Sequence, residues 1–402
     1  MVASASEKPL LKGGKVRGAR VLIVDDSLTV RGALTRSLSQ DPAIEVVATA
    51  GSGERALHEL GRRTVDVVLL DLEMPGMGGM AALPRMLAMH PGLAVIVISS
   101  LTEAGARHSV EALAMGAADT ILKPRPGEFT EDWQQALIDR IHALSARRGI
   151  APPEVPAARQ HLAASEEAPR PAPHLRSVGQ KAAVQGEDAA CGTLRLIAIG
   201  ASTGGIHALG QFLKHLPDHV ALPILVTQHL PAAFMPVFAR QLADISGRPA
   251  TIAEEGAVLE CGSIVIAPGN AHLAIRCEQG PNGPERIHCS LNDNPAPSGF
   301  MPSLDPMFTA IAAALPGQAI GIVLSGMGSD GSAGAALMHR CGNIMLVQDK
   351  ASSAVWGMPR VVAQAGHAHA VMAPDRIARH VARLVTDPLM RNTSERTGRA
   401  AT

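Results

Sequence analysis

The chain of 402 residues has few aromatic side chains and no excess of charge of either sign. Tyrosine is absent, and aromatic residues make up 2% of the chain. Stacking platforms for nucleic-acid bases are therefore not expected. Lysine plus arginine and aspartate plus glutamate each number 36, so the formal net charge is zero. Since no basic excess is available to neutralise phosphates, the composition argues against a nucleic-acid partner.

Cysteine is sparse and is never paired at short spacing. The five cysteines are Cys191, Cys261, Cys277, Cys289 and Cys341. An odd number without a CxxC motif argues against a disulfide framework and against a structural zinc site. The N-terminal region has no signal-like apolar core, and no uncharged apolar run approaches the roughly 20 residues that span a bilayer. We therefore expect a cytoplasmic protein without membrane insertion.

Hydrophobic residues make up 47% of the chain, which is sufficient for globular cores, and their distribution divides the chain. Strand and helix patterns alternate through residues 20–146 and again through residues 193–386. Residues 147–192 are rich in proline and alanine, as is typical of a flexible linker. Residues 1–19 are predicted to be a disordered leader and residues 387–402 a polar tail. The pattern predicts an α/β protein of two doubly wound parallel-sheet domains joined by a flexible linker.

Short apolar runs in the first domain have the length and composition of buried parallel strands. They are Val21–Val24, Ile44–Ala48, Asp66–Leu70, Ala94–Ile98 and Thr120–Leu122. Helical stretches such as Leu28–Ser39 and Gly105–Met115 separate them. Because chemistry in such sheets gathers beyond the carboxyl ends of the strands, the residues that follow these runs are candidates for a site.

Charged and hydroxyl side chains follow four of these strands. They are Asp25 and Asp26 after the first strand, Asp71 after the third, Ser99 after the fourth and Lys123 after the fifth. Three carboxylates at one sheet edge repel each other unless a cation joins them, and oxygen ligands suit Mg²⁺. A lysine and a hydroxyl opposite such a metal could hold a phosphoryl group on Asp71. Each aspartate taken singly could also be a helix or turn cap.

The order of the motifs VDDS, LLDLEMPGM, ISS and LKP resembles the receiver domain of two-component response regulators. The resemblance implies that a histidine kinase phosphorylates Asp71. It also implies that Mg²⁺ binds Asp26, Asp71 and the backbone carbonyl of Glu73, with Asp25 as an outer-shell acid of the metal site.

The same resemblance assigns roles to residues after the last two strands. Ser99 takes the role of the switch hydroxyl, and Lys123 pairs with the phosphoryl group. Receivers usually carry a cis peptide bond before the proline that follows this lysine. The bond between Lys123 and Pro124 is therefore a candidate for a cis peptide bond.

In the second domain, a serine lies in a glycine-rich turn after the apolar run Leu194–Ile199. The turn reads Gly200-Ala201-Ser202-Thr203-Gly204-Gly205 and leads into a helical stretch. Three interpretations are open: a phosphate-binding loop, a helix cap by Ser202 or Thr203, and a nucleophilic serine. No GK[ST] follows, and the next strand ends in Gln228 rather than in a ribose-binding acid, which disfavours a nucleotide site.

A nucleophilic serine needs a base and an acid that orients the base. His229 follows the strand Pro223–Thr227, and Asp330 lies in the turn after Ala319–Leu324. Three turns thus place a serine, a histidine and an aspartate at one edge of a sheet, as a candidate triad. Asp330 could instead cap a helix. Rival acids are Asp293, Asp305 and Asp349.

Six segments resemble the catalytic domain of the chemotaxis protein-glutamate methylesterase. They are IGASTGG, TQHLP, APGNAHL, PSLDPMF, LSGMGSDG and SAVWGMPR. The resemblance implies a Rossmann-like domain with Ser202 as nucleophile, His229 as base and Asp330 as its orienter, behind a flavodoxin-like receiver. The backbone N–H groups of Thr203 and Met327 are candidates for the oxyanion hole.

Together the resemblances imply a phosphorylation-regulated protein-glutamate methylesterase, with glutamine deamidase activity, that acts on methyl-accepting chemotaxis receptors. Its partners are then those receptors and a chemotaxis-type histidine kinase, and the chain is expected to be monomeric. The receiver needs Mg²⁺, whereas the esterase reaction needs no cofactor. We expect the unphosphorylated receiver to cover the strand-end cleft of the second domain. The alternatives are a receiver-controlled binding module with a non-catalytic esterase-like domain, and a dinucleotide enzyme.

Overall fold

The computed structural model describes residues 18–100, 102–124, 130–146, 194–279 and 285–387. The predicted linker and nearly all of the predicted leader and tail lie outside these residues. The N-terminal domain begins with a strand at Ala19, the last residue of the predicted leader, and the C-terminal domain ends with a helix at Thr386.

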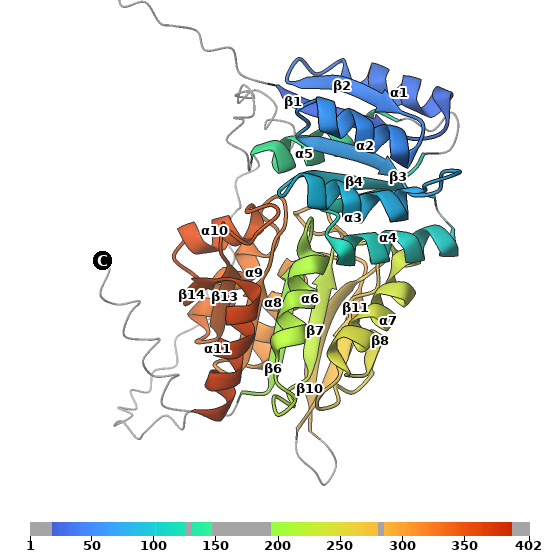
Figure 1. Ribbon diagram of the computed structural model, residues 1–402. Helices are drawn as coiled ribbons and strands as arrows, with labels where there is room; N and C mark the ends of the chain where they lie inside the picture. The colour runs from blue at the N-terminus through green and yellow to red at the C-terminus, as the bar shows by residue number, and fades with distance from the viewer. Residues whose placement is uncertain (1–17, 101, 125–129, 147–193, 280–284, 388–402) are drawn as a thin grey trace, which may run out of the picture.

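The N-terminal domain is a parallel sheet of five strands in the order β2-β1-β3-β4-β5, with helices on both faces (Figure 1). All four neighbouring strand pairs run parallel. The strands are β1 (Ala19–Val24), β2 (Ile44–Ala50), β3 (Val67–Asp71), β4 (Ala94–Ser99) and β5 (Asp119–Leu122). The helices are α1 (Leu28–Leu38), α2 (Gly53–Arg62), α3 (Gly79–Met89), α4 (Glu103–Met115) and α5 (Glu131–Ser145).

Burial and helix capping explain why these residues form these elements. Every residue of β3 is buried, as a central parallel strand with helices on both faces requires. Ser27, Ser52 and Thr130 precede α1, α2 and α5, and each side chain accepts a hydrogen bond from a backbone N–H in the first turn of its helix. Local sequence therefore sets where these helices begin, and burial of both sheet faces holds the layers together.

The C-terminal domain is a sheet of seven strands in the order β14-β13-β12-β6-β7-β9-β8, in which all neighbours run parallel. Its strands are β6 (Leu196–Ala201), β7 (Ile224–Gln228), β8 (Ala250–Ile252), β9 (Ile264–Ile266), β12 (Ala319–Val323), β13 (Ile344–Gln348) and β14 (Ala370–Met372). An antiparallel hairpin, β10 (His272–Glu278) and β11 (Arg286–Asn292), stands apart from this sheet.

Two groups of helices cover the two faces of this sheet. One core contains side chains of α6 (Gly205–His215), α7 (Met235–Ser246), which follows the short η3 (Ala232–Phe234), and α11 (Pro374–Thr386). The other contains side chains of the hairpin, α8 (Leu304–Ala314), α9 (Ser332–Arg340) and α10 (Met358–Gln364). Successive residues of β6 alternate between the two cores, as the period of a strand dictates.

The structure confirms two parallel-sheet α/β domains, and every strand predicted by range lies within two residues of its observed bounds. The candidate cis bond between Lys123 and Pro124 is not present. Among the described residues the cis peptide bond is Met301–Pro302, so Lys123–Pro124 is trans. Trans is the lower-energy form of an X–Pro bond, and Lys123 reaches its carboxylate partners without the cis form.

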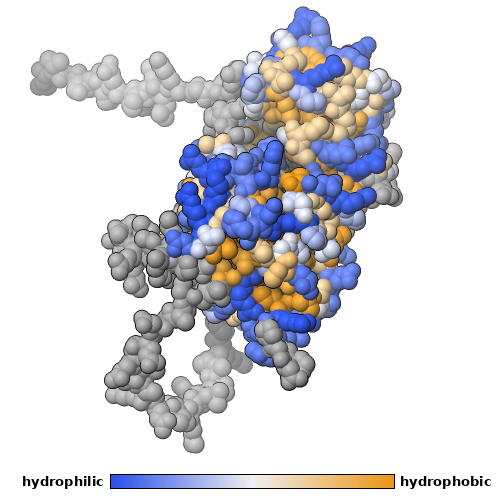
Figure 2. All heavy atoms as spheres, turned by 60° about the horizontal axis from the view of Figure 1, so that its bottom comes forward, coloured by the Kyte–Doolittle hydropathy of each residue, from blue (hydrophilic) through white to orange (hydrophobic). Residues whose placement is uncertain are grey.

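The N-terminal domain lies against the edge of the second sheet where β6 ends (Figure 1). Helix α4 contacts α6, η3 and α7. On the face seen in Figure 2, hydrophilic and hydrophobic patches are interspersed over the molecule, as on most globular proteins. Within the described part of the chain, no helix combines the length and apolar character that a bilayer span requires.

The core beneath α8 offers a test of the fold. Phe308 is fully buried there, so Phe308→Ala is expected to lower the free energy of unfolding of the C-terminal domain by about 3–5 kcal/mol. Trp133 and Trp356 are the two tryptophans, one in each domain. Urea denaturation in a Trp133→Phe background, followed by fluorescence, therefore reports on the C-terminal domain.

Val371, which is 47% exposed, is the control, and Val371→Ala should change the free energy of unfolding by less than about 0.5 kcal/mol. Equal effects of the two variants would contradict this core.

Candidate active site and acidic cluster

Three strand-to-helix turns of the C-terminal domain meet at the switch point of its sheet. Strand β6 lies between β7 and β12. Both strands follow β6 in the sequence, but they lie on opposite sides of it in the sheet, so the strand order reverses there. Crevices in open α/β sheets lie beyond the carboxyl ends of strands at such a point. Ser202 follows β6, His229 follows β7, and Asp330 lies in the turn between β12 and α9. The topology therefore brings these three residues together.

The three side chains form one continuous hydrogen-bonded chain. Nδ1 of His229 lies 3.0 Å from Oγ of Ser202, and Nε2 of His229 lies 2.8 Å from Oδ2 of Asp330. A carboxylate only accepts, so a neutral imidazole donates from Nε2 and leaves Nδ1 to accept the serine proton. In chymotrypsin-like proteases the opposite ring nitrogen faces the serine. The donor and acceptor roles are nevertheless the same.

A backbone hydrogen bond and closely packed glycines fix the turn that carries the Ser202 hydroxyl. The N–H of Ser202 donates to the Ser325 carbonyl at 3.0 Å, and Gly204 follows with a φ of 73° in the left-handed region. A Cβ atom on Gly205 would lie 2.6 Å from the Cβ of Ala201, so that position requires glycine. Gly204, not Ser202 or Thr203, is the N-cap of α6 and forms no side-chain cap bond. The helix-cap interpretation of the serine is therefore wrong.

Asp330 is also not a helix cap, since Gly331 occupies the N-cap position of α9 without a side-chain bond. The rival acids are engaged elsewhere or open to solvent. Asp305 accepts from the Gly334 N–H, Asp349 accepts from Ser352, and Asp293 is exposed.

The charge of Asp330 is buried but well satisfied. Burial alone would raise its pKa, but hydrogen bonds from His229, from Oγ of Ser303 at 2.6 Å and from the N–H of Leu304 at 2.8 Å outweigh this effect. The pKa of Asp330 therefore lies below its ordinary value, and the group is ionised at neutral pH.

Three further residues surround the triad, and the sequence patterns do not point to a role for any of them. The ring of Phe300 stacks on that of His229, with centroids 4.1 Å apart and an angle of 15° between the planes. Ser303 contacts Asp330, and His272 in turn contacts the backbone of Ser303. All three lie in or beside the segments APGNAHL and PSLDPMF, whose resemblance to the methylesterase domain marks them as motifs but assigns no chemical role to these residues.

The two oxyanion candidates lie on the turns next to the triad. Among the described residues, the backbone N–H groups of Thr203 and Met327 have no hydrogen-bond acceptor. The Thr203 hydroxyl donates to Oδ2 of Asp119 in the N-terminal domain at 2.6 Å. The Met327 side chain packs against a hydrophobic cluster that contains residues of both domains, Val355 of the C-terminal domain among them. The turn after Ser202 is thus contacted by the N-terminal domain, and Met327 lies beside a cluster to which both domains contribute.

The N-terminal domain contacts the turn that follows Ser202. The N–H of Gly204 donates to the Ala118 carbonyl at 2.7 Å, two residues from Ser202. Beside this contact is a cavity of about 290 Å³, lined by residues of both domains, among them Leu93, Ala118 and His207. Ser202 itself is 9% exposed.

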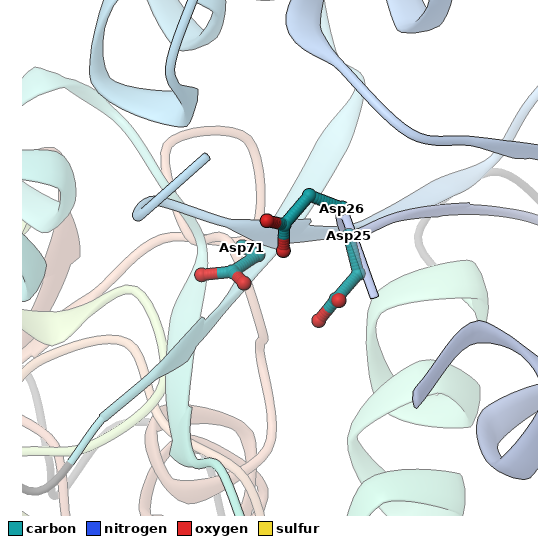
Figure 3. A group of neighbouring side chains, drawn as sticks. All are labelled: Asp25, Asp26 and Asp71. Carbon is teal, nitrogen blue, oxygen red and sulfur yellow. The ribbon is translucent and has the colours of Figure 1, made fainter. Parts of the chain in front are cut away.

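An acidic cluster lies at the carboxyl ends of β1 and β3 (Figure 3). One carboxylate oxygen from each of Asp25, Asp26 and Asp71 lies within 4.8 Å of the others. Nζ of Lys123 lies 2.7 Å from Oδ2 of Asp25 and 2.8 Å from Oδ2 of Asp71. Oxygen donors of this kind, with Asp26 exposed to solvent, fit a hard divalent cation such as Mg²⁺.

Burial and pairing shift the pKa values in this cluster. Burial of Asp25 and the nearby charge of Asp71 raise the pKa of Asp25, although the Lys123 ammonium opposes the rise. Burial would lower the pKa of Lys123, but its two carboxylate partners raise it above the ordinary value. The lysine is therefore a permanent cation beside Asp71 at neutral pH.

The other predicted residues of this cluster lie close by but point elsewhere. The Glu73 N–H donates to Oδ1 of Asp71, whereas its carboxylate accepts from the Ser100 hydroxyl. The Ser99 hydroxyl donates to the carbonyls of Ser100 and Gly105 rather than to Asp71. The side chains of Asp25, Asp26, Asp71 and Lys123 thus form the cluster, and Ser99 stands at its rim.

Comparisons with known proteins agree with this division of the chain. The model of the response regulator receiver domain matches residues 21–132, and that of the CheB methylesterase matches residues 197–381. The protein-glutamate methylesterase/protein-glutamine glutaminase 2 of Caulobacter vibrioides is 40% identical over 365 residues, which cover 90% of this chain and 98% of that protein. The corresponding protein 1 of Rhodospirillum rubrum is 38% identical over 377 residues, which cover 92% and 95%.

The crystal structure of the Thermotoga maritima CheB methylesterase catalytic domain is 30% identical, with a TM-score of 0.46, and covers 48% of this chain and all of that domain. The sequence matches define the class: a response-regulator receiver domain followed by a methylesterase domain. The chain belongs to the protein-glutamate methylesterase/protein-glutamine glutaminase family.

The lowered pKa of Asp330 predicts a contribution to stability that is lost in acid. A carboxyl group whose pKa is lower in the folded than in the unfolded state stabilises the fold above its unfolded pKa, and this contribution disappears as pH falls through the folded pKa. We expect the difference in unfolding free energy between the wild type and Asp330→Asn to be constant above about pH 5 and to change below about pH 4, as the wild type loses stability. Urea denaturation between about pH 3 and pH 7, in the Trp133→Phe background, measures it. A difference independent of pH would contradict the prediction.

Proposed function

We propose that this chain is a phosphorylation-regulated protein-glutamate methylesterase with glutaminase activity, acting on methyl-accepting chemoreceptors. The observation that carries the proposal is the hydrogen-bonded chain from Ser202 through His229 to Asp330. The names of relatives that match nearly the whole chain supply the substrate class. The phosphodonor is a chemotaxis-type histidine kinase, and the protein acts as a cytoplasmic monomer.

In the proposed reaction, Oγ of Ser202 attacks the γ-carbonyl carbon of a glutamate methyl ester while Nδ1 of His229 accepts the hydroxyl proton. The N–H groups of Thr203 and Met327 donate to the oxyanion that forms, where one such donor contributes about 3 kcal/mol. His229 then returns the proton to the departing methoxide, which leaves as methanol. A water molecule attacks the acyl-enzyme by the reverse proton path and releases the glutamate carboxylate.

Deamidation of a glutamine follows the same route. The amide carbonyl replaces the ester carbonyl, and His229 protonates the leaving nitrogen so that ammonia departs instead of methanol. The acyl-enzyme is identical in the two reactions, so one triad serves both.

The competing function is a receiver-controlled binding module whose esterase-like domain does not turn over. Such a module has no need of an aligned nucleophile, base and acid. The 3.0 Å and 2.8 Å contacts of His229 and the buried charge of Asp330 favour the enzyme.

In the receiver, we assign Asp71 as the phosphoryl acceptor. Asp26, Asp71 and the carbonyl of Glu73 would hold Mg²⁺, with Asp25 in its outer shell. The metal supplies positive charge that neutralises the phosphoryl oxygens. Lys123, already paired with Asp71, supplies a second positive charge.

Regulation is proposed to work by docking of the receiver over the esterase site. Helix α4 connects the two regions: the Ser99 hydroxyl bonds the Gly105 carbonyl in its first turn, and Ala118 and Asp119, just beyond its end, bond the turn after Ser202. A shift of the Ser99 hydroxyl toward a phosphoryl group on Asp71 breaks its bond to the Gly105 carbonyl. Helix α4 can then change its position relative to the esterase domain. Phosphorylation can then change the ratio of docked to undocked molecules only by as much as it changes the affinity of the receiver for the esterase domain.

The nucleophile assignment predicts that Ser202→Ala lowers methanol release by about 10⁶-fold, as in related triads. Base-trapped volatile methanol from methyl-labelled receptors, with and without a phosphodonor, measures the rate. Ser246, distant on α7 with its hydroxyl on the Leu242 carbonyl, provides the matched control Ser246→Ala. Turnover of Ser202→Ala close to that of Ser246→Ala would remove Ser202 from the role.

The docking assignment predicts that Asp119→Ala raises the basal rate of the unphosphorylated chain, because the bond to Thr203 is lost. Deletion of residues 1–192 should raise it at least as much. Glu59→Ala, which removes an exposed ion pair with Arg63 on α2, is the control and should leave the rate unchanged. Unchanged basal rates in both Asp119→Ala and the deletion would show that docking does not restrain the enzyme.

A further inference from the structure

The N-terminus of α8 points at the carboxylate of the triad. Oδ1 of Asp330 accepts from the Ser303 hydroxyl at 2.6 Å, and Oδ2 accepts from the Leu304 N–H at 2.8 Å as well as from His229. The N-terminus of a helix presents free N–H groups and the positive end of the helix dipole. Each oxygen of the carboxylate therefore has a donor from the start of α8, in addition to the imidazole partner of Oδ2.

Ser303 occupies the N-cap position of α8 but does not cap it. A serine at this position ordinarily accepts a hydrogen bond from the N–H two or three residues later. Here the side chain forms no such bond and instead donates to Asp330. Since a carboxylate cannot donate, the direction of this bond is certain, and the Ser298 hydroxyl donates to Ser303 in turn at 3.2 Å. Local helix capping thus does not explain the position of this hydroxyl.

His272 holds the backbone of the same serine. Its Nδ1 accepts from the Ser303 N–H at 2.9 Å, and its Nε2 lies 2.9 Å from the carbonyl of Asn294. These partners define a neutral imidazole that donates from Nε2. His272 and Ser303 are both completely buried, so neither hydrogen bond competes with water. The serine is fixed on its backbone side and on its hydroxyl side.

We propose that Ser303 is a positioning residue of the triad and that His272 holds it in place. The inference rests on the proposed function, because it concerns the acid of the same site. Ser303 fixes the rotation of the Asp330 carboxylate, so that Oδ2 faces Nε2 of His229. It also takes up part of the carboxylate charge, which limits how strongly Asp330 stabilises the protonated imidazole.

Loss of the hydroxyl has two consequences that can be separated. The carboxylate becomes free to rotate, which lowers kcat. Oδ1 loses its donor, so more negative charge faces the imidazole, the protonated base is stabilised, and the rising limb of the pH–rate profile moves to higher pH. A residue with a merely structural role would lower activity at all pH values without moving this limb.

The test uses the full chain with a phosphodonor and methyl-labelled receptors. Ser303→Ala is expected to lower kcat by roughly 10- to 100-fold, by analogy with residues that orient metal-ligating side chains, with little change in KM and with the shift of the limb. Ser303→Thr retains a hydroxyl and should restore both the rate and the profile. Ser246→Ala, which removes an equivalent hydroxyl far from the site, should match the wild type.

A second measurement does not depend on turnover of the receptor. The proton between Nε2 of His229 and Asp330 gives a low-field resonance in the proton NMR spectrum, which Ser303→Ala should displace and Ser246→Ala should not. His272→Leu should displace it in the same direction, because Ser303 loses its backbone partner.

The outcomes separate this inference from the proposed function. If the wild type releases no methanol but Ser303→Ala still displaces the resonance, the substrate assignment fails and the positioning role stands. If Ser303→Ala leaves the resonance and the pH limb in place, the positioning role is overturned, whatever the wild-type activity.

Discussion

A buried negative charge is the constraint on which the second domain depends. Asp330 is 2% exposed, and an unpaired carboxylate in such a place would be strongly destabilising. The sheet supplies an imidazole from β7, and α8 supplies a hydroxyl and a backbone N–H. These donors keep the carboxylate ionised, and their geometry leaves Nδ1 of His229 facing the Ser202 hydroxyl, as the proposed base requires. Stability and reactivity thus rest on the same set of hydrogen bonds.

The receiver contacts the same edge of the sheet. The turn after β6 must leave Ser202 uncovered for a substrate, and its N–H and hydroxyl groups are therefore open to other acceptors. In this structure the Ala118 carbonyl and the Asp119 carboxylate take two of them, at Gly204 and Thr203. In the proposed function, a docking surface on this turn would couple access of substrate to domain association without any change inside the triad itself.

The two sheets of this chain therefore place carboxylates in opposite environments, one partly open to solvent and the other enclosed. In the receiver, three carboxylates lie close together, two of them paired with a lysine and the third exposed, an arrangement suited to a cation and a phosphoryl group that bind and leave. In the esterase domain a single carboxylate is enclosed and fully partnered, an arrangement suited to a base that must keep one orientation through each reaction. Helix α4 lies between the two sites.

Apolar runs and the polar residues that follow them were enough to predict both folds, the strand bounds within two residues, and the candidates Ser202, His229 and Asp330, because parallel strands place their carboxyl ends at one edge. The trans bond before Pro124, the stacking of Phe300 and the roles of His272 and Ser303 were not predictable in this way. Ser303 reads as an ordinary helix cap in the sequence, and His272 as one of 16 histidines. Periodicity along a strand determines which residues reach the edge of the sheet, whereas only the packing of α8 and the hairpin against that sheet decides which hydroxyl meets which carboxylate, since such contacts join segments up to 31 residues apart.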